Sequence, residues 1–230
     1  MSNPGALFII GSGPMMGSHI ASLFASKTFT KIALFARSSS NLEQNVSFIK
    51  STSPSVSIKT YLADVTDTPG LTTALHTAVS DLGPPEVVVF NAARINYGTL
   101  GSYSPEDIMI DFKIPNLGLY TTAVVLLPGL QKLAKEKPDS HPSLFVTSSL
   151  LIEKPYGPVF SLSMAKTAQA SLVKLLAEEN KDVVHVALVT AGGPISFEEK
   201  VNNPPKVAER FWELWEQKKG AWELEVKHGW

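Results

Sequence analysis

The sequence feature that most constrains the fold is a glycine-rich turn directly after a short apolar run. Residues 6–10 are all apolar, and residues 11–17 read GSGPMMG. Gly11 permits a sharp turn, Gly13 lets backbone amides approach a diphosphate, and Gly17 lets the next helix pack closely on a sheet. A helix that begins here presents free N–H groups to an anion. The turn predicts a strand, a nucleotide-binding loop and a helix; the simpler alternative is a tight strand–helix connection.

Apolar runs alternate with helical patterns along the chain, which is typical of a doubly wound parallel sheet. Runs of continuous apolar residues suit strands that are covered on both faces. We predict seven strands, at Ala6–Ile10, Lys31–Phe35, Ser57–Leu62, Val87–Phe90, Leu144–Thr147, Val184–Val189 and Glu223–Val226. We predict helices at Met15–Ser26, Leu42–Lys50, Leu71–Asp81 and Ser161–Asn180. Residues 1–230 therefore form one α/β domain of Rossmann type, with helices on both faces.

Two segments need separate interpretations. Pro105–Leu133 has the pattern of two helices, and Pro115 predicts a break or kink between them because proline interrupts a helical ladder. Residues 197–220 depart from the strand–helix alternation and contain an aromatic helix with Trp212 and Trp215. We interpret this segment as a substrate lid or an interface, because exposed aromatic side chains need a partner surface.

Composition narrows the range of partners. The net charge of −1 gives no electrostatic reason to expect nucleic acid or an anionic membrane as a partner. The absence of cysteine excludes disulfides and thiolate chemistry, and the five histidines lack metal-ligand spacing, so no metal site is expected. The apolar run before Gly11 is too short for a signal peptide or a membrane span. We expect a cytoplasmic location.

The end of the second predicted strand indicates which dinucleotide the loop accepts. NAD-binding Rossmann domains place an acid there to hold the ribose hydroxyls. This chain instead has Arg37, followed by Ser38 and Ser39. A guanidinium group pairs well with a 2′-phosphate, and the serines add hydroxyl donors. These residues favour NADP(H) over NAD(H); the alternative is a solvated arginine on a loop.

Further motifs occur in a fixed order and together resemble the short-chain dehydrogenase/reductase superfamily. The resemblance implies that Ser12 and Met16 belong to the cofactor loop, and that Asp64 and Val65 contact adenine. It also implies a place at the cofactor for the segment Asn91-Ala92-Ala93 after the fourth strand. Gly192, Ile195 and Ser196, after the sixth strand, are then expected beside the nicotinamide.

The resemblance also implies an active site, with one departure. The family places a serine at the end of the fifth strand, a tyrosine thirteen residues later and a lysine four residues beyond it. Ser149 and Lys166 fit this spacing, but Leu162 stands where the tyrosine is expected. Leucine cannot donate a proton, and loss of a positioned acid typically costs about 10²–10⁴-fold in rate. Lys166 can still hold the cofactor ribose.

Two other positions bear on the proton supply. The family often has an asparagine that organises a relay water, and here Pro115 aligns with it while Asn116 lies beside it. Tyr156 lies between Ser149 and Lys166 in the sequence and is a candidate substitute donor; the alternative is an aromatic wall residue.

Three functional hypotheses remain open. The first is an NADP(H)-dependent oxidoreductase with an unusual proton source, acting on a small hydrophobic substrate. The second is a non-redox enzyme on the same fold, such as a cyclase, isomerase or dehydratase. The third is an inactive NADP(H)-binding sensor protein. Apolar residues beyond one stripe in Pro105–Leu133 also predict a homodimer or homotetramer.

Overall fold

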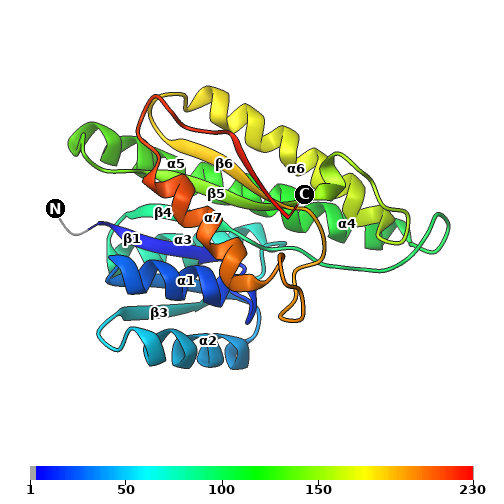
Figure 1. The fold of residues 1–230 in the computed structure, drawn as a ribbon, viewed down its shortest axis with the longest axis horizontal. Coiled ribbons are helices and arrows are strands. Elements are labelled where there is room, and N and C mark those ends of the chain that lie inside the picture. The colour runs from blue at the N-terminus through cyan, green and yellow to red at the C-terminus, as the bar shows by residue number, and fades with distance from the viewer. Residues whose placement is uncertain (1–3, 230) are drawn as a thin grey trace.

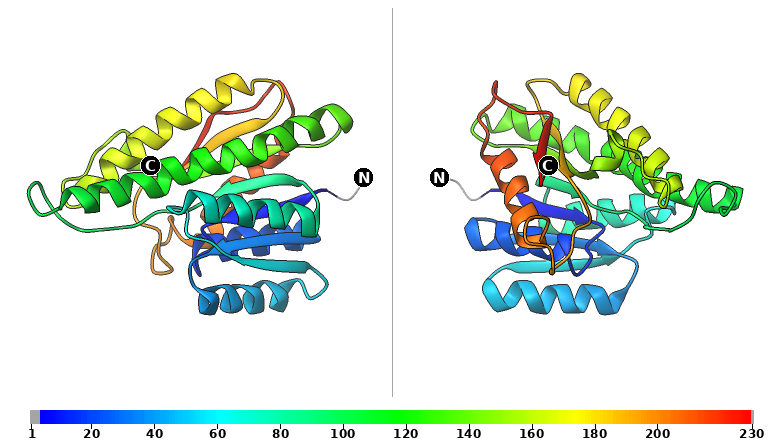
Figure 2. Two further views of the ribbon diagram at one scale, coloured as in Figure 1. Left: turned by 180° about the vertical axis from the view of Figure 1, so that it is seen from behind. Right: turned by 45° about the vertical axis from the view of Figure 1, so that its right-hand side comes forward.

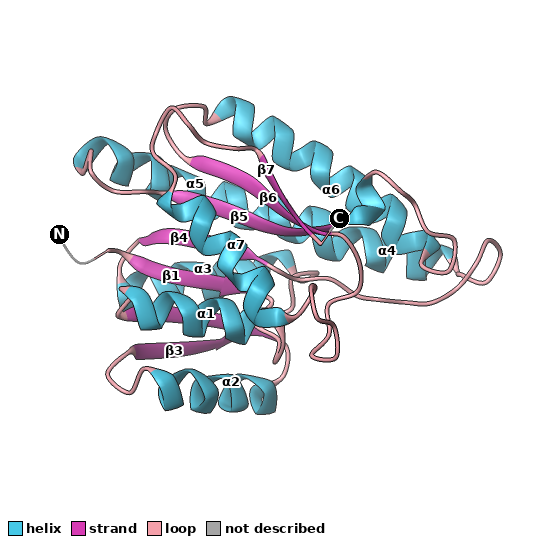
Figure 3. Ribbon diagram, in the orientation of Figure 1, coloured by secondary structure: helices cyan, strands magenta, loops and turns pink. Residues whose placement is uncertain are grey.

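The apolar runs of the sequence form the strands of one parallel sheet (Figures 1 and 3). The computed structural model describes residues 4–229. All neighbouring strands are parallel, in the order β3-β2-β1-β4-β5-β6-β7, which confirms the predicted sheet. The strands are β1 (Ala6–Ile10), β2 (Lys31–Ala36), β3 (Ser57–Leu62), β4 (Pro85–Phe90), β5 (Ser143–Ser149), β6 (His185–Ala191) and β7 (Glu225–His228). Each overlaps a predicted strand.

Helices cover both faces of the sheet (Figure 2). Helices α1 (Met16–Lys27), α2 (Ser39–Thr52) and α7 (Pro204–Glu216) share one core cluster. Helices α3 (Thr68–Leu82), α5 (Gly118–Glu136) and α6 (Phe160–Glu179) share the other, and α4 (Pro105–Phe112) packs beside α6. A short 3₁₀ turn, η2 (Leu150–Ile152), follows β5. The four helices predicted at Met15–Ser26, Leu42–Lys50, Leu71–Asp81 and Ser161–Asn180 are confirmed as α1, α2, α3 and α6.

Polar side chains set where several helices begin. Ser38 accepts a hydrogen bond from the Asn41 backbone at the start of α2, and Asp67 accepts one from Gly70 at the start of α3. Ser104 and Asn203 cap α4 and α7 in the same way. Each cap satisfies a backbone N–H that the first helical turn leaves unpaired.

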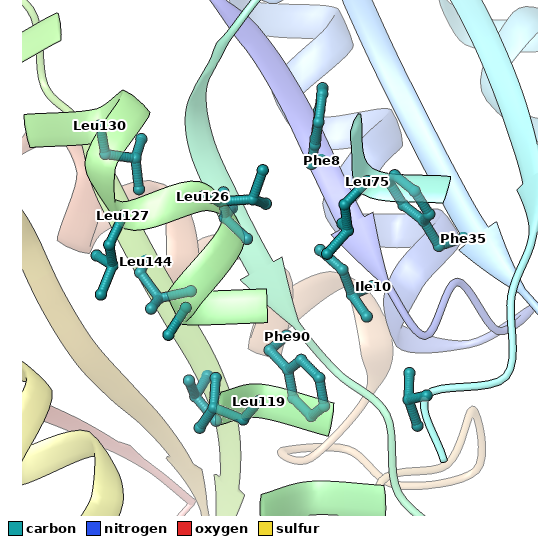
Figure 4. Packing of buried hydrophobic residues seen from close by; sticks show 14 of the residues in the cluster. Phe8, Ile10, Phe35, Leu75, Phe90, Leu119, Leu126, Leu127, Leu130 and Leu144 are labelled. Carbon is teal, nitrogen blue, oxygen red and sulfur yellow. The ribbon is translucent and has the colours of Figure 1, made fainter. Parts of the chain in front are cut away.

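The core has two halves because successive strand residues point to opposite faces. In β1, Leu7 and Ile9 pack towards α1, whereas Phe8 and Ile10 pack towards α3. Figure 4 shows Phe8, Ile10 and Phe35 near Leu75, and a second group from α5 over β4 and β5.

The order of the strands creates the crevice that holds the candidate site. Strand β1 lies between β2 and β4, so the chain leaves β1 towards one side and leaves β4 towards the other. Ligands of open α/β sheets bind at such a switch point, outside the carboxyl ends of the strands.

The predicted interruption of the α-helix at Pro115 is confirmed, and its form is a π-helical turn between two α-helices. The helical ladder continues from α4 into α5 through a π-helical turn, η1 (Lys113–Leu117), which contains Pro115. A π turn adds a residue to the ladder and so tolerates a missing N–H. The whole stretch Pro105–Glu136 is long and apolar enough to cross a membrane by composition, but half of its most apolar window is buried in the domain.

The interpretation of 197–220 as a lid rested on exposed aromatic side chains, and that premise is wrong. Phe211 and Leu214 of α7 are fully buried against the sheet. Trp212 packs edge-on against Phe24 at 5.1 Å between ring centroids, and Trp215 packs against Phe29 at 5.1 Å. The aromatic helix is part of a core layer, and only the loop of residues 197–203 remains a candidate lid.

Candidate cofactor and active site

The three glycines of the first loop have three different environments. Gly11 has a φ of +88°, and a Cβ there would lie 2.6 Å from the Ala92 backbone nitrogen. A Cβ on Gly17 would lie 2.6 Å from the Ser12 Cα, so glycine allows α1 to approach the loop. A Cβ on Gly13 would have no heavy atom of the described residues within 4 Å. Only the Gly13 position opens onto free space, as a diphosphate cradle requires.

A cleft of about 490 Å³ lies next to Gly13, where β1, β2 and β4 end. Ten of the residues predicted to bind cofactor line it: Gly11, Ser12, Gly13, Arg37, Ser38, Asp64, Val65, Asn91, Ala92 and Ala93. Asn41 and Ile114 also line it, and the sequence analysis missed both. A larger groove of about 1020 Å³ lies beside β3 between α2 and α3, but it contains none of the ten. The smaller cleft is the candidate site because it lies at the switch point of the sheet.

Arg37 and Asp64 provide opposite charges at one end of this cleft. Asp64 Oδ1 accepts hydrogen bonds from the backbone nitrogen and the hydroxyl of Thr66, at 2.8 and 2.7 Å. Burial raises the pKa of Asp64, but these hydrogen bonds and the charge of Arg37 outweigh it and leave that pKa below its usual value. Arg37 itself is exposed. An exposed guanidinium group beside a half-buried carboxylate can bind an incoming phosphate.

Amide side chains connect the walls of the cleft. Asn91 donates from Nδ2 to the Gly11 carbonyl at 3.0 Å, and its Oδ1 accepts from the Thr147 hydroxyl at 2.7 Å. Asn45, which the sequence analysis missed, donates to the carbonyl and the hydroxyl of Ser12 at 2.9 and 3.0 Å. The glycine loop is therefore bound to α2, β4 and β5 before any ligand arrives.

Several predicted cofactor residues lie outside the residues that line the cleft. Met16 is buried in the core at the start of α1. Gly192 packs against Gly229, and its backbone nitrogen donates to the His228 carbonyl at 2.7 Å. Ile195 packs against the core, and the Ser196 hydroxyl donates to the Glu198 carboxylate in the same loop.

Ser149, Leu162 and Lys166 lie at the end of β5 and on the buried side of α6. The Ser149 Oγ is buried and has no hydrogen-bond partner among the described residues. Leu162 is buried, with 6% of its surface exposed. Lys166 Nζ donates to the Thr147 carbonyl at 2.8 Å and to Gln169 Oε1 at 2.9 Å. Burial lowers the pKa of Lys166 to about 8, because a low-dielectric interior disfavours the charged form.

The structure does not bring Tyr156 to this group. Its side chain is 57% exposed and lines a surface groove with Phe160 and Met164 on the outer side of α6. The Ser163 hydroxyl accepts a hydrogen bond from the Tyr156 backbone nitrogen at 3.1 Å and donates one to the Tyr156 carbonyl at 3.3 Å. The proton-donor and aromatic-wall interpretations of Tyr156 therefore stay predictions.

The side chain of Asn116 has a structural role. Its Nδ2 donates to the carbonyls of Phe112 and Ala165, at 3.0 and 3.1 Å, and so joins the π turn to α6. The neighbouring Pro115 carbonyl accepts a hydrogen bond from Gln169 Nε2 at 3.0 Å. Gln169 is not among the site residues predicted from the sequence, although its position three residues after Lys166, on the same side of the helix, is a usable signal.

Arg94 is another residue that the sequence analysis missed. It follows the Asn91-Ala92-Ala93 segment and pairs with two carboxylates of α4, Asp111 and Asp107. Asp111 has no exposed side-chain surface. The pair fixes the loop after β4 to α4, beside the cleft.

Comparison with known proteins adds sequence relationships to this geometry. A model of the short chain dehydrogenase family matches residues 6–199. The 3-dehydrosphinganine reductase TSC10A of Arabidopsis thaliana is 28% identical over 208 residues. That match covers 87% of this chain and 60% of the relative, so the chain spans less than two thirds of the relative's length.

Solved structures share the fold over nearly the whole chain. An alcohol dehydrogenase from the archaeon Thermococcus sibiricus, complexed with 5-hydroxy-NADP, has a TM-score of 0.85 at 21% identity, covering 97% of this chain and 95% of that one. A short chain oxidoreductase from Pseudomonas aeruginosa PAO1, described as containing an atypical catalytic center, has a TM-score of 0.84 at 15% identity, with the same coverages. At these identities the likeness establishes the fold.

Proposed function

The chain belongs to the short-chain dehydrogenase family of oxidoreductases, and we propose that it binds NADP(H) and transfers hydride without a tyrosine proton donor. The bound nicotinamide cofactor would supply the hydride. Gly11, Gly13 and the start of α1 would hold its diphosphate, Asp64 and Val65 its adenine, and Arg37 its extra phosphate. The substrate would be small and apolar, and water would supply the proton.

The observation that supports this proposal best is the position of Arg37 at the cleft. It lines the same cleft as Gly13 and contributes its charge to the electrostatics of Asp64. A bidentate guanidinium group favours a 2′-phosphate, whereas an acid at this place would repel it. The Thermococcus sibiricus relative is complexed with 5-hydroxy-NADP, which agrees with this choice.

The test is a titration of the purified protein with NADPH and NADH, followed by fluorescence. We expect NADPH to bind more tightly, and Arg37→Ala to remove most of the preference. Loss of a charge-assisted hydrogen bond corresponds to about 10–100-fold in affinity. Arg210→Ala, a change on α7 away from the cleft, is the matched control. Equal affinity for the two dinucleotides in the wild-type protein would contradict the proposal.

Turnover is tested by NADPH oxidation with a panel of ketones, imines and enones. We expect imines and enones to react more readily than ketones, because an activated double bond needs less help from an acid. Leu162→Tyr should raise the ketone rate if Ser149 and Lys166 are poised for the reaction. No change in that variant would show that they are not.

One observation favours a second function, an NADP(H)-binding protein without redox turnover. Leu162 offers no proton, and Tyr156 lines a groove on the outer side of α6. Tight NADPH binding with no oxidation across the panel would select this alternative. Conversion of a substrate without any change in nicotinamide absorbance would instead indicate non-redox chemistry, such as isomerisation or dehydration.

We also propose that the protein is a homodimer through helices α5 and α6. Large apolar side chains on these helices are exposed: Leu117 just before α5, Tyr120 and Val124 on α5, and Met164 and Leu175 on α6. A second copy of the chain would cover this surface.

A further inference from the structure

A continuous series of hydrogen bonds joins the π turn to the glycine loop, and Lys166 lies at its centre. Lys166 Nζ donates to the Thr147 carbonyl at 2.8 Å. The Thr147 hydroxyl donates to Asn91, whose amide donates to the Gly11 carbonyl at 3.0 Å. On the other side, Lys166 Nζ donates to Gln169 Oε1 at 2.9 Å. A change at Gln169 can therefore reach the loop that borders the cleft.

Gln169 can adopt only one amide orientation in this series. Its two neighbours are the Pro115 carbonyl, which only accepts hydrogen bonds, and the Lys166 ammonium, which only donates them. Nε2 must face Pro115 and Oε1 must face Lys166, and an exchange of the two atoms would lose both bonds. Gln169 is 1% exposed, so water does not compete for either contact. The side chain is thus a rigid bridge of defined polarity.

We propose that Gln169 is a positioning residue that fixes the Lys166 ammonium and leaves its third N–H for an oxygen atom of a ligand that reaches from the cleft to the end of β5. An ammonium group has three donors, and two are used by Thr147 and Gln169. The ligand atom is a hydroxyl or phosphate oxygen of the dinucleotide, so this inference rests on the proposed NADP(H) binding. Without Gln169 the ammonium would lose one of two protein acceptors and its fixed direction.

Among the described residues, the hydrogen-bond partners of Lys166 Nζ are two neutral oxygens, the Thr147 carbonyl and Gln169 Oε1. The titratable groups on the elements packed against α6 are Glu106, Asp107 and Asp111 of α4, Lys113 of the π turn and His185 of β6. Burial is the cause of its lowered pKa, and none of these groups contributes. The hydrogen bonds to Thr147 and Gln169 are therefore the contacts through which a substitution can change the charge state of Lys166.

The test compares Gln169→Leu and Gln169→Glu with the wild-type protein. Leucine removes both hydrogen bonds. Glutamate replaces the neutral acceptor of Lys166 with an anion of nearly the same size, and its carboxylate cannot donate to the Pro115 carbonyl. Gln131→Leu is the matched control, because Gln131 also bonds across two helices, to Asn180 at 2.8 Å, but on α5 away from the cleft. The Lys166 pKa is followed by the ¹³Cε NMR signal in lysine-labelled protein, assigned by its loss in Lys166→Met. The NADPH dissociation constant is measured from pH 6 to 10.

We expect the wild-type Lys166 signal to titrate near pH 8, at a lower pH in Gln169→Leu and at a higher pH in Gln169→Glu. NADPH affinity should fall as the ammonium loses its proton, with a midpoint that moves in the same directions. At pH 7 the leucine variant should bind NADPH about tenfold more weakly, the scale of one hydrogen bond to a charged group. Gln131→Leu should match the wild type in both measurements.

Two results would overturn the proposal. One is a Lys166 titration that is the same in all four proteins, and the other is shifted Lys166 titrations with unchanged NADPH affinity at every pH. Circular dichroism establishes that each variant is folded, and Gln169→Glu keeps the side-chain volume if the leucine variant does not fold. If even the wild-type protein fails to bind NADPH, the proposed function fails, and the NMR titration still decides whether Gln169 positions Lys166.

Discussion

Arg94 neutralises a carboxylate that has no exposed surface: its Nε lies 2.5 Å from Asp111 Oδ1. A second nitrogen of the same guanidinium group lies 3.0 Å from Asp107 at the start of α4. Asp111 Oδ2 has no hydrogen-bond partner among residues 4–229. Arg94 is thus the group that makes a buried charge tolerable beside the cleft.

Arg94→Ala should destabilise the protein by about 3 kcal/mol, because removal of one partner leaves the other charge buried and unpaired. The measurement is urea unfolding at pH 7. Arg94→Ala combined with Asp111→Asn should recover part of the loss, since a neutral amide costs less to bury than a carboxylate. The control, Arg210→Ala, breaks a pair with the exposed Glu213 and should cost less than about 1 kcal/mol. Similar losses for the two arginine variants would contradict the role of Arg94.

The glycine loop allows a prediction that separates folding from binding. Gly13→Ala should leave stability within about 0.5 kcal/mol of the wild type, because the new Cβ meets free space. The same methyl group should weaken NADPH binding at least about tenfold, since it occupies the approach of the diphosphate.

Gly11→Ala is the contrasting variant. Its φ of +88° and its close approach to Ala92 should cost about 1–3 kcal/mol in the free energy of unfolding. Urea unfolding and NADPH titration of both variants are the measurements. Unchanged NADPH affinity in Gly13→Ala would place the diphosphate elsewhere.

The contrast between the two glycines explains why much of the cleft could be predicted from the sequence. A glycine turn, a charged residue at a strand end and an apolar run each act over a few neighbouring residues. Their consequences for the backbone are therefore visible in the local pattern. Arg37, Asp64 and Asn91 follow strands, and parallel strands bring their ends to one edge of the sheet.

The parts of the fold and the site that could not be predicted depend on contacts between segments that are far apart in the sequence. Gln169 joins Lys166 to Pro115, and Arg94 joins a loop to Asp111, and neither pairing follows from local spacing. The aromatic pattern of α7 is equally compatible with a lid and with a core helix. The choice depends on α1 and the turn that follows it, where Phe24 and Phe29 pack against the two tryptophans.

The proposed dimer predicts that paired charges on α5 separate the subunits. Tyr120 and Val124 lie one turn apart on the same face and are 56% and 57% exposed. Tyr120→Glu with Val124→Glu should weaken dimerisation at least about 100-fold, because each buried apolar side chain contributes about 1.5–3 kcal/mol. Sedimentation equilibrium measures the change. Leu62→Glu, an equally exposed position on the edge strand β3, should leave the dimer intact. A monomeric wild-type protein would refute the proposal.

The buried Lys166 predicts how stability changes with pH. Its pKa is about 8 in the folded protein and 10.5 in an unfolded chain. Between these values the unfolded state binds a proton that the folded state has released, so stability rises with pH through this window. Below pH 8 both states are protonated, and the folded state has the full cost of a buried charge. Lys166→Met removes the effect.

The measurement is the free energy of unfolding in urea at pH 7.5 and 9.5. Relative to Lys166→Met, the wild-type protein should gain roughly 2 kcal/mol over this interval, since one pKa unit corresponds to about 1.4 kcal/mol. Lys174→Met changes a lysine on the exposed side of the same helix and should follow the wild-type curve. A constant difference between wild type and Lys166→Met would show that Lys166 stays protonated in the folded protein up to pH 9.5. Its two neutral acceptors would then hold the charge more firmly than burial disfavours it.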